Sequence, residues 1–381
     1  MRSNHRGTDR RRIRATVSAD SIVLHTRLGV LGTGSALPGA AVTTSELVRR
    51  ASAYLPPSAP ALALRIGKRL SINARHLVRS FDAPQEVPRP TDTAPKLAAR
   101  AVRAALADGV HDVERLRMLL GHTATPHTLL PGNVAWVAEE MGYLGAHMEL
   151  RQACTGFAAA TVLSAALVAS GVDPIAIVGS ETGSVFLDPR HAAVDKSQLV
   201  NLVQMGDGAG AIALGPIGNT TLGRIELAFY GSLGGNRAPG IALEQGGSGS
   251  PHLDTTRTPH FTHDHEAVGA HGFELLRASL RVATESGVAP ESIDWWLAHP
   301  ANGRMAEHVA RWLKLPPEKV FCEASVLGNL GSAAIWVALD RLRRSGRLAE
   351  GDRVMVLGAE ASKYMFGGLL YVHGNSGRPD T

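Results

Sequence analysis

The sequence predicts an α/β fold built from two similar halves, because of its composition, its alternating helix and strand patterns and an internal repeat. Apolar residues make up 44% of the 381-residue chain and charged residues 19%, and 41 residues are glycine. That composition is typical of a compact enzyme and excludes a disordered chain. The length allows a large buried core, in one big domain or in two similar ones.

The repeat begins with a helix, a strand and a histidine. Residues 97–126 and residues 275–302 each read as an amphipathic helix, a Gly-Val stop, a short acidic segment and an apolar strand that ends near a histidine. The two histidines, His122 and His299, are 177 residues apart. Because a repeated pattern predicts a repeated fold, this match is the first evidence for a duplication.

The segments that follow repeat at nearly the same distance. Cys154 and Asn329, each at the start of a helix of small residues, are 175 residues apart. The predicted strands at residues 177–181 and residues 356–360 are 179 residues apart. Several matches at nearly one offset favour a tandem of two equivalent units over chance similarity.

We therefore expect two α/β halves, residues 25–215 and residues 216–374, each with a mainly parallel sheet covered by helices. The halves would pack face to face through helices. A duplicated fold places equivalent loops near a pseudo-two-fold axis. Cys154, His299 and Asn329 then become neighbours although they are far apart in the sequence.

Residues 1–24 are expected to form a disordered basic arm and residues 375–381 a tail. Six arginines lie in the first fourteen residues, which show no hydrophobic periodicity. We favour a solvated arm over a contact with nucleic acid. The net charge of +5 could steer an acidic partner toward the protein.

The cysteine count and the hydropathy indicate a soluble protein of the cytoplasm. The two cysteines, Cys154 and Cys322, imply no disulfide framework, so a reducing compartment fits. The N-terminus lacks the apolar core of a signal peptide. The longest near-apolar run, residues 156–170, is shorter than the roughly 20 residues that a membrane-spanning helix needs. We expect neither a membrane nor a nucleic acid as a partner.

Cys154 is the candidate nucleophile. Residues 149–151 end a predicted strand, and the run of small apolar residues after Gly156 predicts a buried helix. The thiol would lie at a helix N-terminus, where the helix dipole lowers a thiol pKa and backbone N–H groups can bind an oxyanion. Taken alone, Cys154 would more often be an inert buried thiol. Its place in the repeat favours catalysis.

His299 and Asn329 are the candidate partners of the nucleophile. His299 follows the apolar strand at residues 295–298, and strand ends are where α/β folds place their chemistry. Both side chains can donate a hydrogen bond to one thioester oxygen. Such bonds stabilise the enolate that forms when a malonyl thioester loses carbon dioxide. Either residue alone would more often be structural.

Three motifs resemble those of the β-ketoacyl-ACP synthase III family: ACTGF with Cys154, HPANGR with His299 and GNLGSAA with Asn329. The segment MGDGAGAIAL at residues 205–214 is also similar, and the resemblance covers nearly the whole chain after residue 25. It implies a thiolase-like fold, with two duplicated α/β halves layered α-β-α-β-α. It also implies a homodimeric acyltransferase (EC 2.3.1 class) without a cofactor or a metal.

The family's chemistry would run in two steps. Cys154 takes an acyl group from acyl-CoA or from an acyl carrier protein (ACP), and the group then condenses with a malonyl or β-ketoacyl thioester on ACP. Backbone N–H groups at Cys154 and at Ala361 or Ser362 would bind the thioester oxygen. The carrier thioesters are substrates in this scheme.

The substrate-binding residues follow the family only in part. Arg69, Asn302 and Arg304 match residues that contact CoA or line the pantetheine tunnel. Arg65 stands where relatives carry a tryptophan that stacks on the CoA adenine, so CoA binds in an altered way or ACP is the donor. Leu130 stands where some relatives carry a phenylalanine that limits chain length, which favours a longer or branched primer.

Two segments depart further. Residues 188–205 are longer than usual, which indicates a changed acyl pocket, and residues 358–369 contain the unusual Glu360 and Lys363. We therefore expect a role in specialised lipid or polyketide biosynthesis rather than in housekeeping fatty-acid initiation. Two alternatives stay open: acyl transfer to an oxygen or nitrogen acceptor, and a non-catalytic subunit of a heteromeric synthase.

Five histidines lie between His252 and His271. Of these, His263 and His265 could bind a metal together with Asp264. Zinc sites usually show firmer spacing and additional Cys or Glu ligands. We therefore favour a solvated loop over a metal site.

Overall fold

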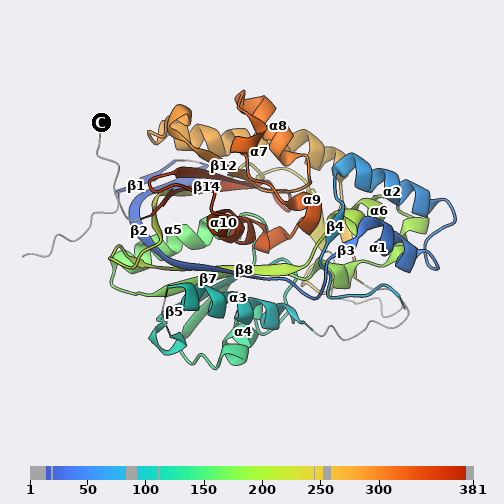
Figure 1. The fold of residues 1–381 in the computed structure, drawn as a ribbon. Coiled ribbons are helices and arrows are strands. Elements are labelled where there is room, and N and C mark those ends of the chain that lie inside the picture. The colour runs from blue at the N-terminus through green and yellow to red at the C-terminus, as the bar shows by residue number, and fades with distance from the viewer. Residues whose placement is uncertain are drawn as a thin grey trace, which may run out of the picture.

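The fold has five layers, in which two sheets alternate with three layers of helices (Figure 1). The computed structural model describes residues 14–18, 20–82, 92–109, 112–243, 245–251 and 259–374. The outer helix layers are α7 and α8 on one side and α3 and α4 on the other, with α5 and α10 in the middle. These helices are α3 (Ala94–Asp108), α4 (Asn133–Met141), α5 (Gly156–Ala169), α7 (His265–Glu285), α8 (Met305–Leu313) and α10 (Ala334–Arg344). The predicted α-β-α-β-α layering is confirmed.

The two sheet layers are parts of one continuous ten-stranded sheet, and the long strand β2 (Ser21–Ala36) joins them. It pairs antiparallel with β9 in one half and with β8 in the other, and its register shifts within both ladders. The strands follow one another in the order β12-β13-β14-β9-β2-β8-β7-β5-β6. Their bounds are β5 (Met118–His122), β6 (Ala146–Leu150), β7 (Ile175–Glu181), β8 (Gly208–Pro216), β9 (Gly223–Ser232), β12 (Trp295–Ala298), β13 (Arg353–Glu360) and β14 (Met365–His373).

The two halves repeat the same pairing pattern. β5 pairs parallel with β7, and β7 pairs antiparallel with β8. In the same way, β12 pairs parallel with β13, and β13 pairs antiparallel with β14. The expectation of mainly parallel sheets is wrong, because the last strand of each half runs back along its neighbour. The tight turn at residues 361–364 shows how little chain such an antiparallel return needs.

The start of the chain is more ordered than expected. β1 (Arg14–Val17) pairs antiparallel with the first part of β2, with Arg14 opposite His25. The strands therefore begin before residue 25, where the sequence predicted the end of a disordered arm. Residues 1–13 and the predicted tail at 375–381 lie outside the described residues. The division into halves at residues 215 and 216 stays a prediction.

The middle helix layer explains the small-residue run after Cys154. Helix α5 carries no charged side chain, and the residues of its first turn, Gly156, Phe157 and Ala158, are buried. Its Phe157 packs edge to face against Trp336 of α10, with the ring centroids 5.8 Å apart. The N-terminus of α5 therefore lies in the interior, between the two sheets.

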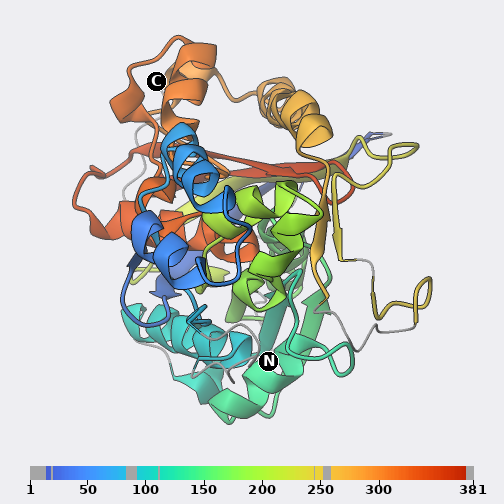
Figure 2. The same ribbon diagram turned by 90° about the vertical axis from the view of Figure 1, so that its right-hand side faces the viewer.

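Shorter elements cover one side of the layered core. Figure 2 faces this side and shows the blue helices α1 and α2 and the yellow-green α6 in front of the sheets. These elements are α1 (Thr44–Ala51), α2 (Ala59–Leu70), α6 (Ser197–Gln204), α9 (Ala324–Leu327), β3 (Val42–Thr43), β4 (Ala74–Arg75), β10 (Ile241–Leu243) and β11 (Phe261–His263). Among the described residues, no helix is long and apolar enough to span a membrane.

Candidate active site

A single internal cavity brings the three predicted catalytic residues together. Its volume is about 1150 Å³, and Cys154, His299 and Asn329 all line it. They come from three separate connections: β6 to α5, β12 to α8, and α9 to α10. The predicted neighbourhood of these residues across the two halves is therefore seen in the structure.

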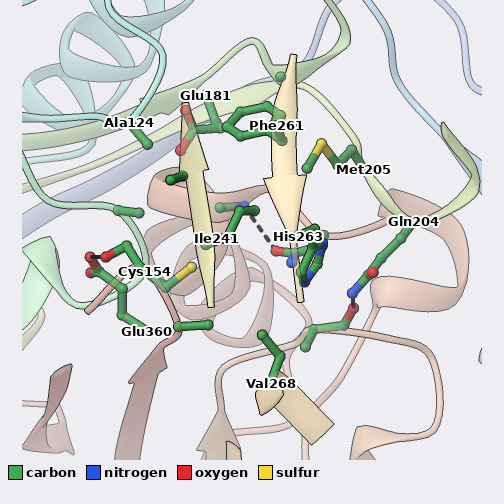
Figure 3. A pocket seen from close by; sticks show the side chains of 18 of the residues that line it. Ala124, Cys154, Glu181, Gln204, Met205, Ile241, Phe261, His263, Val268 and Glu360 are labelled. Atoms are coloured by element: carbon green, nitrogen blue, oxygen red, sulfur yellow. Dashed lines mark hydrogen bonds between the residues drawn. The ribbon is translucent and has the colours of Figure 1, made fainter. Parts of the chain in front are cut away.

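Cys154 lies on the turn between β6 and α5, one residue before the helix cap Thr155. Its side chain is partly exposed to the cavity, and Figure 3 shows the sulfur directed toward the strand pair β10–β11. The ring of His122 packs closely against Gly156. A Cβ atom added to Gly156 would lie 2.4 Å from Nδ1 of His122. The start of α5 thus tolerates only glycine, which fixes the position of the thiol.

Two buried glutamates, Glu360 and Glu181, flank Cys154 (Figure 3). Glu360 accepts hydrogen bonds from the backbone N–H of Thr155 (3.0 Å) and from its hydroxyl group (2.7 Å). Glu181 accepts bonds from the N–H of Ser332 (3.0 Å) and from its hydroxyl group (2.8 Å). The two carboxylates end β7 and β13, the strands that match in the repeat.

Burial, together with these carboxylates, raises the pKa of the nucleophile where the sequence predicted a lowered one. Burial, and then the negative charges of Glu360 and Glu181, raise the pKa of the Cys154 thiol well above its usual value. The prediction of a lowered pKa is wrong mainly because the thiol is buried. In addition, Glu360 binds the N–H at the start of α5 and places a negative charge at the positive end of the helix dipole. The resting enzyme therefore holds Cys154 as a thiol.

His299 follows β12 directly and is only 5% exposed. Its backbone N–H donates to the carbonyl oxygen of Leu357 at 2.8 Å, which ties it to the neighbouring strand β13. Burial lowers the pKa of its imidazole to about 4, so the ring is neutral near pH 7. Neither ring nitrogen has a hydrogen-bond partner in the described part of the chain, which leaves the ring available to a ligand in the cavity.

Asn329 is held by backbone bonds on both sides. Its N–H donates to Gln204 O (2.8 Å), and its carbonyl accepts the N–H of Gly206 (3.0 Å). Its side-chain Oδ1 accepts the N–H of Gly331 at 3.0 Å. Because the oxygen is engaged, the Nδ2 amide is the group that remains to donate. Gly331 has a φ of 50°, and a Cβ there would lie 2.5 Å from Glu181, so only glycine fits this turn.

The turn between β13 and β14 supplies further backbone to the cavity wall. Ala359, Glu360, Ala361 and Ser362 all line the cavity, and the binding of a thioester oxygen by backbone N–H groups at Ala361 or Ser362 stays a prediction. The carbonyl oxygen of Ala361 accepts the N–H of Gly240, which fixes the turn. The Ser362 hydroxyl donates to Glu360, so the unusual glutamate is held from two directions.

The structure divides the predicted substrate-binding residues into two groups. Arg69 and Asn302 line the cavity. Arg304 is exposed at the start of α8 and is not part of the wall, although its N–H donates to Asn302 Oδ1 at 2.9 Å. Leu130 is 89% exposed and is not part of the wall of its own chain's cavity, and its neighbour Leu129 lines it instead.

The histidines after His252 do not form the expected solvated loop. His263 ends β11 and lines the cavity, and His265 begins α7 and also lines it. Among the described residues, no group of three His, Cys, Asp or Glu side chains is arranged to hold a metal ion. His252 lies outside the described residues. The sequence does contain one signal, since His263 stands two residues after Phe261 and side chains two apart share a face of a strand.

Comparison with known proteins gives consistent matches over the length of the chain. Residues 148–231 match the family model of 3-oxoacyl-[acyl-carrier-protein (ACP)] synthase III, and residues 283–371 match its C-terminal model. The β-ketoacyl-[acyl-carrier-protein] synthase III of Bordetella petrii is 31% identical, covering 86% of this chain and 93% of that protein. Its namesake from Bradyrhizobium sp. strain BTAi1 is 30% identical, covering 90% and 97%.

A solved structure is similar as well. It is AbyA1, a tetronic acid condensing enzyme, with a TM-score of 0.77 and 27% sequence identity, covering 91% of this chain and all of that one. Fold and sequence therefore agree that the protein is a thiolase-like condensing enzyme, an acyltransferase. Within that class, the chain belongs to the β-ketoacyl-ACP synthase III family, since relatives of that name match nearly its whole length.

Proposed function

We propose that Cys154, His299 and Asn329 carry out a decarboxylative Claisen condensation in the 1150 Å³ cavity. The observation that carries the proposal is the meeting of these three side chains, from three distant segments, in one cavity. In the first step the sulfur of Cys154 attacks an acyl-CoA or acyl-ACP thioester. The carrier leaves as a thiol and takes up the proton that Cys154 loses.

In the second step a malonyl thioester on ACP enters and loses carbon dioxide. The electron pair of the broken C–C bond forms an enolate, whose oxygen accepts hydrogen bonds from the neutral His299 ring and from the Asn329 Nδ2 amide. The enolate carbon attacks the Cys154 thioester, a C–C bond forms, and the Cys154 thiolate leaves. The raised thiol pKa supports rapid reprotonation of that thiolate.

The similarity to AbyA1 and the residues that line the cavity both support a role in a specialised pathway. AbyA1 is described as a tetronic acid condensing enzyme, and its similarity supports a secondary-metabolite role for this chain. Glu360 at the end of β13, His263 on β11 and His265 on α7 place polar groups on the cavity wall. A cytoplasmic location fits the two free cysteines.

A homodimer is the form in which we expect the enzyme to act. Strand β6 is the last strand of the sheet, and Ala146, His147 and Met148 on it are exposed. An edge strand with unpaired backbone groups is suited to pairing with a second copy. Light scattering on the purified protein should give the mass of two chains; the mass of one chain would contradict the proposal.

The test of the chemistry is intact-protein mass spectrometry with a panel of acyl-CoA and acyl-ACP donors, followed by malonyl-ACP. We expect one acyl adduct that malonyl-ACP discharges. Cys154→Ala should abolish the adduct, and Cys322→Ala, the matched control, should keep it. Absence of an adduct with every donor would contradict the enzyme mechanism. An adduct that resists malonyl-ACP but is discharged by an alcohol or an amine would indicate an O- or N-acyltransferase.

A further inference from the structure

The cavity contains an imidazole that the condensation does not use. His263, at the end of β11, lines the same cavity as Cys154. Figure 3 shows the two side chains on opposite sides of that cavity, with the strand that bears Ile241 between them in the view. His263 is not part of the Cys154, His299 and Asn329 set, so its position needs a separate explanation.

A chain of hydrogen bonds behind His263 determines which of its ring nitrogens carries the proton. Nε2 of Gln198 donates to the backbone oxygen of Phe261 and to the carboxylate of Asp195, both at 2.9 Å. Both groups accept only, so the orientation of the Gln198 amide is fixed. Its oxygen then accepts from Nδ2 of Asn201 at 3.3 Å, and Oδ1 of Asn201 accepts from Nδ1 of His263 at 2.7 Å.

The free nitrogen of His263 is therefore an acceptor. With the proton on Nδ1, the lone pair is on Nε2, which makes no hydrogen bond within the ranges that the structure describes. Burial and the neighbouring His265 ring, whose centroid lies 3.6 Å away, lower the pKa of His263 to about 3. Asp264 and Asp195 act in the opposite direction and do not restore the charge. The ring stays neutral under physiological conditions.

The cavity wall that contains this acceptor is partly apolar. Val200, Ile241, Phe261 and Val268 line the cavity together with His263, and the His265 ring packs beside it. A buried hydrogen-bond acceptor is costly to leave unpaired when a ligand excludes water, and it selects ligands that bring a donor. An acyl chain without polar groups would leave Nε2 without a partner.

We propose that the acyl group delivered to Cys154 carries a hydroxyl group that donates a hydrogen bond to Nε2 of His263. The inference rests on the function proposed above and names the substrate class of that site: a hydroxyacyl thioester. Asn201 and Gln198 are positioning residues, because they touch only the chain of bonds behind the ring and do not line the cavity. His263 is a specificity-determining residue and takes no part in breaking the thioester.

The experiment compares matched pantetheine thioesters that differ by one hydroxyl group: lactoyl with propionyl, and 3-hydroxybutyryl and 4-hydroxybutyryl with butyryl. The readout is the rate of Cys154 acylation, followed by intact mass. In at least one pair the wild-type enzyme should prefer the hydroxylated thioester by at least about tenfold. His263→Phe should lose that preference, measured as the ratio of the two acylation rates within each pair.

Variants behind the ring test the fixed tautomer. Asn201→Asp keeps an acceptor for Nδ1 and should keep the preference, whereas Asn201→Leu should reduce it. Thermal melting identifies a variant that does not fold, and His263→Gln, which retains an acceptor oxygen, then provides the second comparison: it should keep part of the preference.

Two results would overturn the inference while the condensation stands: acylation of Cys154 without preference in every pair, or an unchanged preference in His263→Phe. Failure of every acyl group to reach Cys154, from pantetheine and from ACP, would instead overturn the proposed function, and the inference with it. Acylation by butyryl pantetheine distinguishes the two failures, because it shows that Cys154 is a working nucleophile whether or not a hydroxyl group is preferred.

Discussion

The two halves of the protein place a histidine at the same point of the repeat and use it differently. His122 ends β5, is 1% exposed, and its Nε2 accepts the indole N–H of Trp336 at 3.1 Å. His299 follows β12, and its ring faces the cavity. Burial lowers the pKa of both rings to about 4. The duplicated fold thus supplies a neutral imidazole twice. The neighbouring residues decide whether the ring packs in the core, as in His122, or is available to a ligand, as in His299.

The largest effect on the condensation rate should come from removing a side chain that faces the cavity, His299 or Asn329. His299→Ala and Asn329→Ala should each lower the condensation rate by about 10² to 10³, because each removes one donor to the enolate oxygen. Self-acylation should fall much less, since it precedes decarboxylation. Single-turnover assays measure the two steps separately, and His25→Gln on β2 is the control. Equal losses in both steps would contradict the roles assigned here.

The equivalent change in the other half should affect stability instead. His122→Ala should lower the free energy of unfolding by about 2–4 kcal/mol, because it leaves a cavity and an unpaired Trp336 N–H in the core. His299→Ala should change it by no more than about 1 kcal/mol. Urea denaturation of both variants measures the difference. Similar losses would show that the two histidines share one role.

A smaller effect is expected at the paired glutamates. Glu360→Gln removes a negative charge near the thiol, so the pKa of Cys154 should fall and alkylation by iodoacetamide at pH 7 should become about three- to tenfold faster. The pH profile of alkylation should move to lower pH, since less alkaline conditions then give the thiolate. Glu323→Gln, which pairs with Arg341 away from the cavity, is the control. An unchanged profile would mean that burial alone sets the pKa.

The smallest effect concerns the cavity mouth. Arg69 of the N-terminal half lines the cavity, and Arg304 of the C-terminal half does not. Arg69→Ala should raise KM for an acyl-CoA about threefold without lowering kcat, because it removes binding shared by ground and transition states. Arg304→Ala should change KM less. The reverse order would return Arg304 to the role that sequence similarity gave it.

The sequence predicted much of this arrangement because local patterns determine it. Strand ends and small-residue helices are readable from short segments, so the positions of Cys154, His299 and Asn329 relative to their own helices and strands were predictable. The offset between the halves then placed the three segments together. The α-β-α-β-α layering was implied by the resemblance to the family.

What escaped prediction depends on contacts between distant segments. The raised pKa of Cys154 results from burial and then from the charges of Glu360 and Glu181, and Glu360 is 205 residues away from the Thr155 that it binds. The place of His263 in the cavity wall depends on Asn201, 62 residues earlier. The sequence predicted Leu130 in the cavity wall, and the structure has its neighbour Leu129 there. Similarity to a family does not resolve such a one-residue shift in an exposed turn.

The position of strand β2 has a consequence for how the protein unfolds. Because it pairs with β8 on one edge and β9 on the other, each sheet depends on a strand that the other sheet also uses. A fragment that contains only the residues after Pro216 would lack β2. The edge of β9 that pairs with β2 would then be exposed and prone to aggregation. We expect the halves to melt as one cooperative unit and to stay rigid relative to each other during turnover. Access of the carrier-bound substrates must then depend on the short elements around the cavity, not on a hinge between the halves.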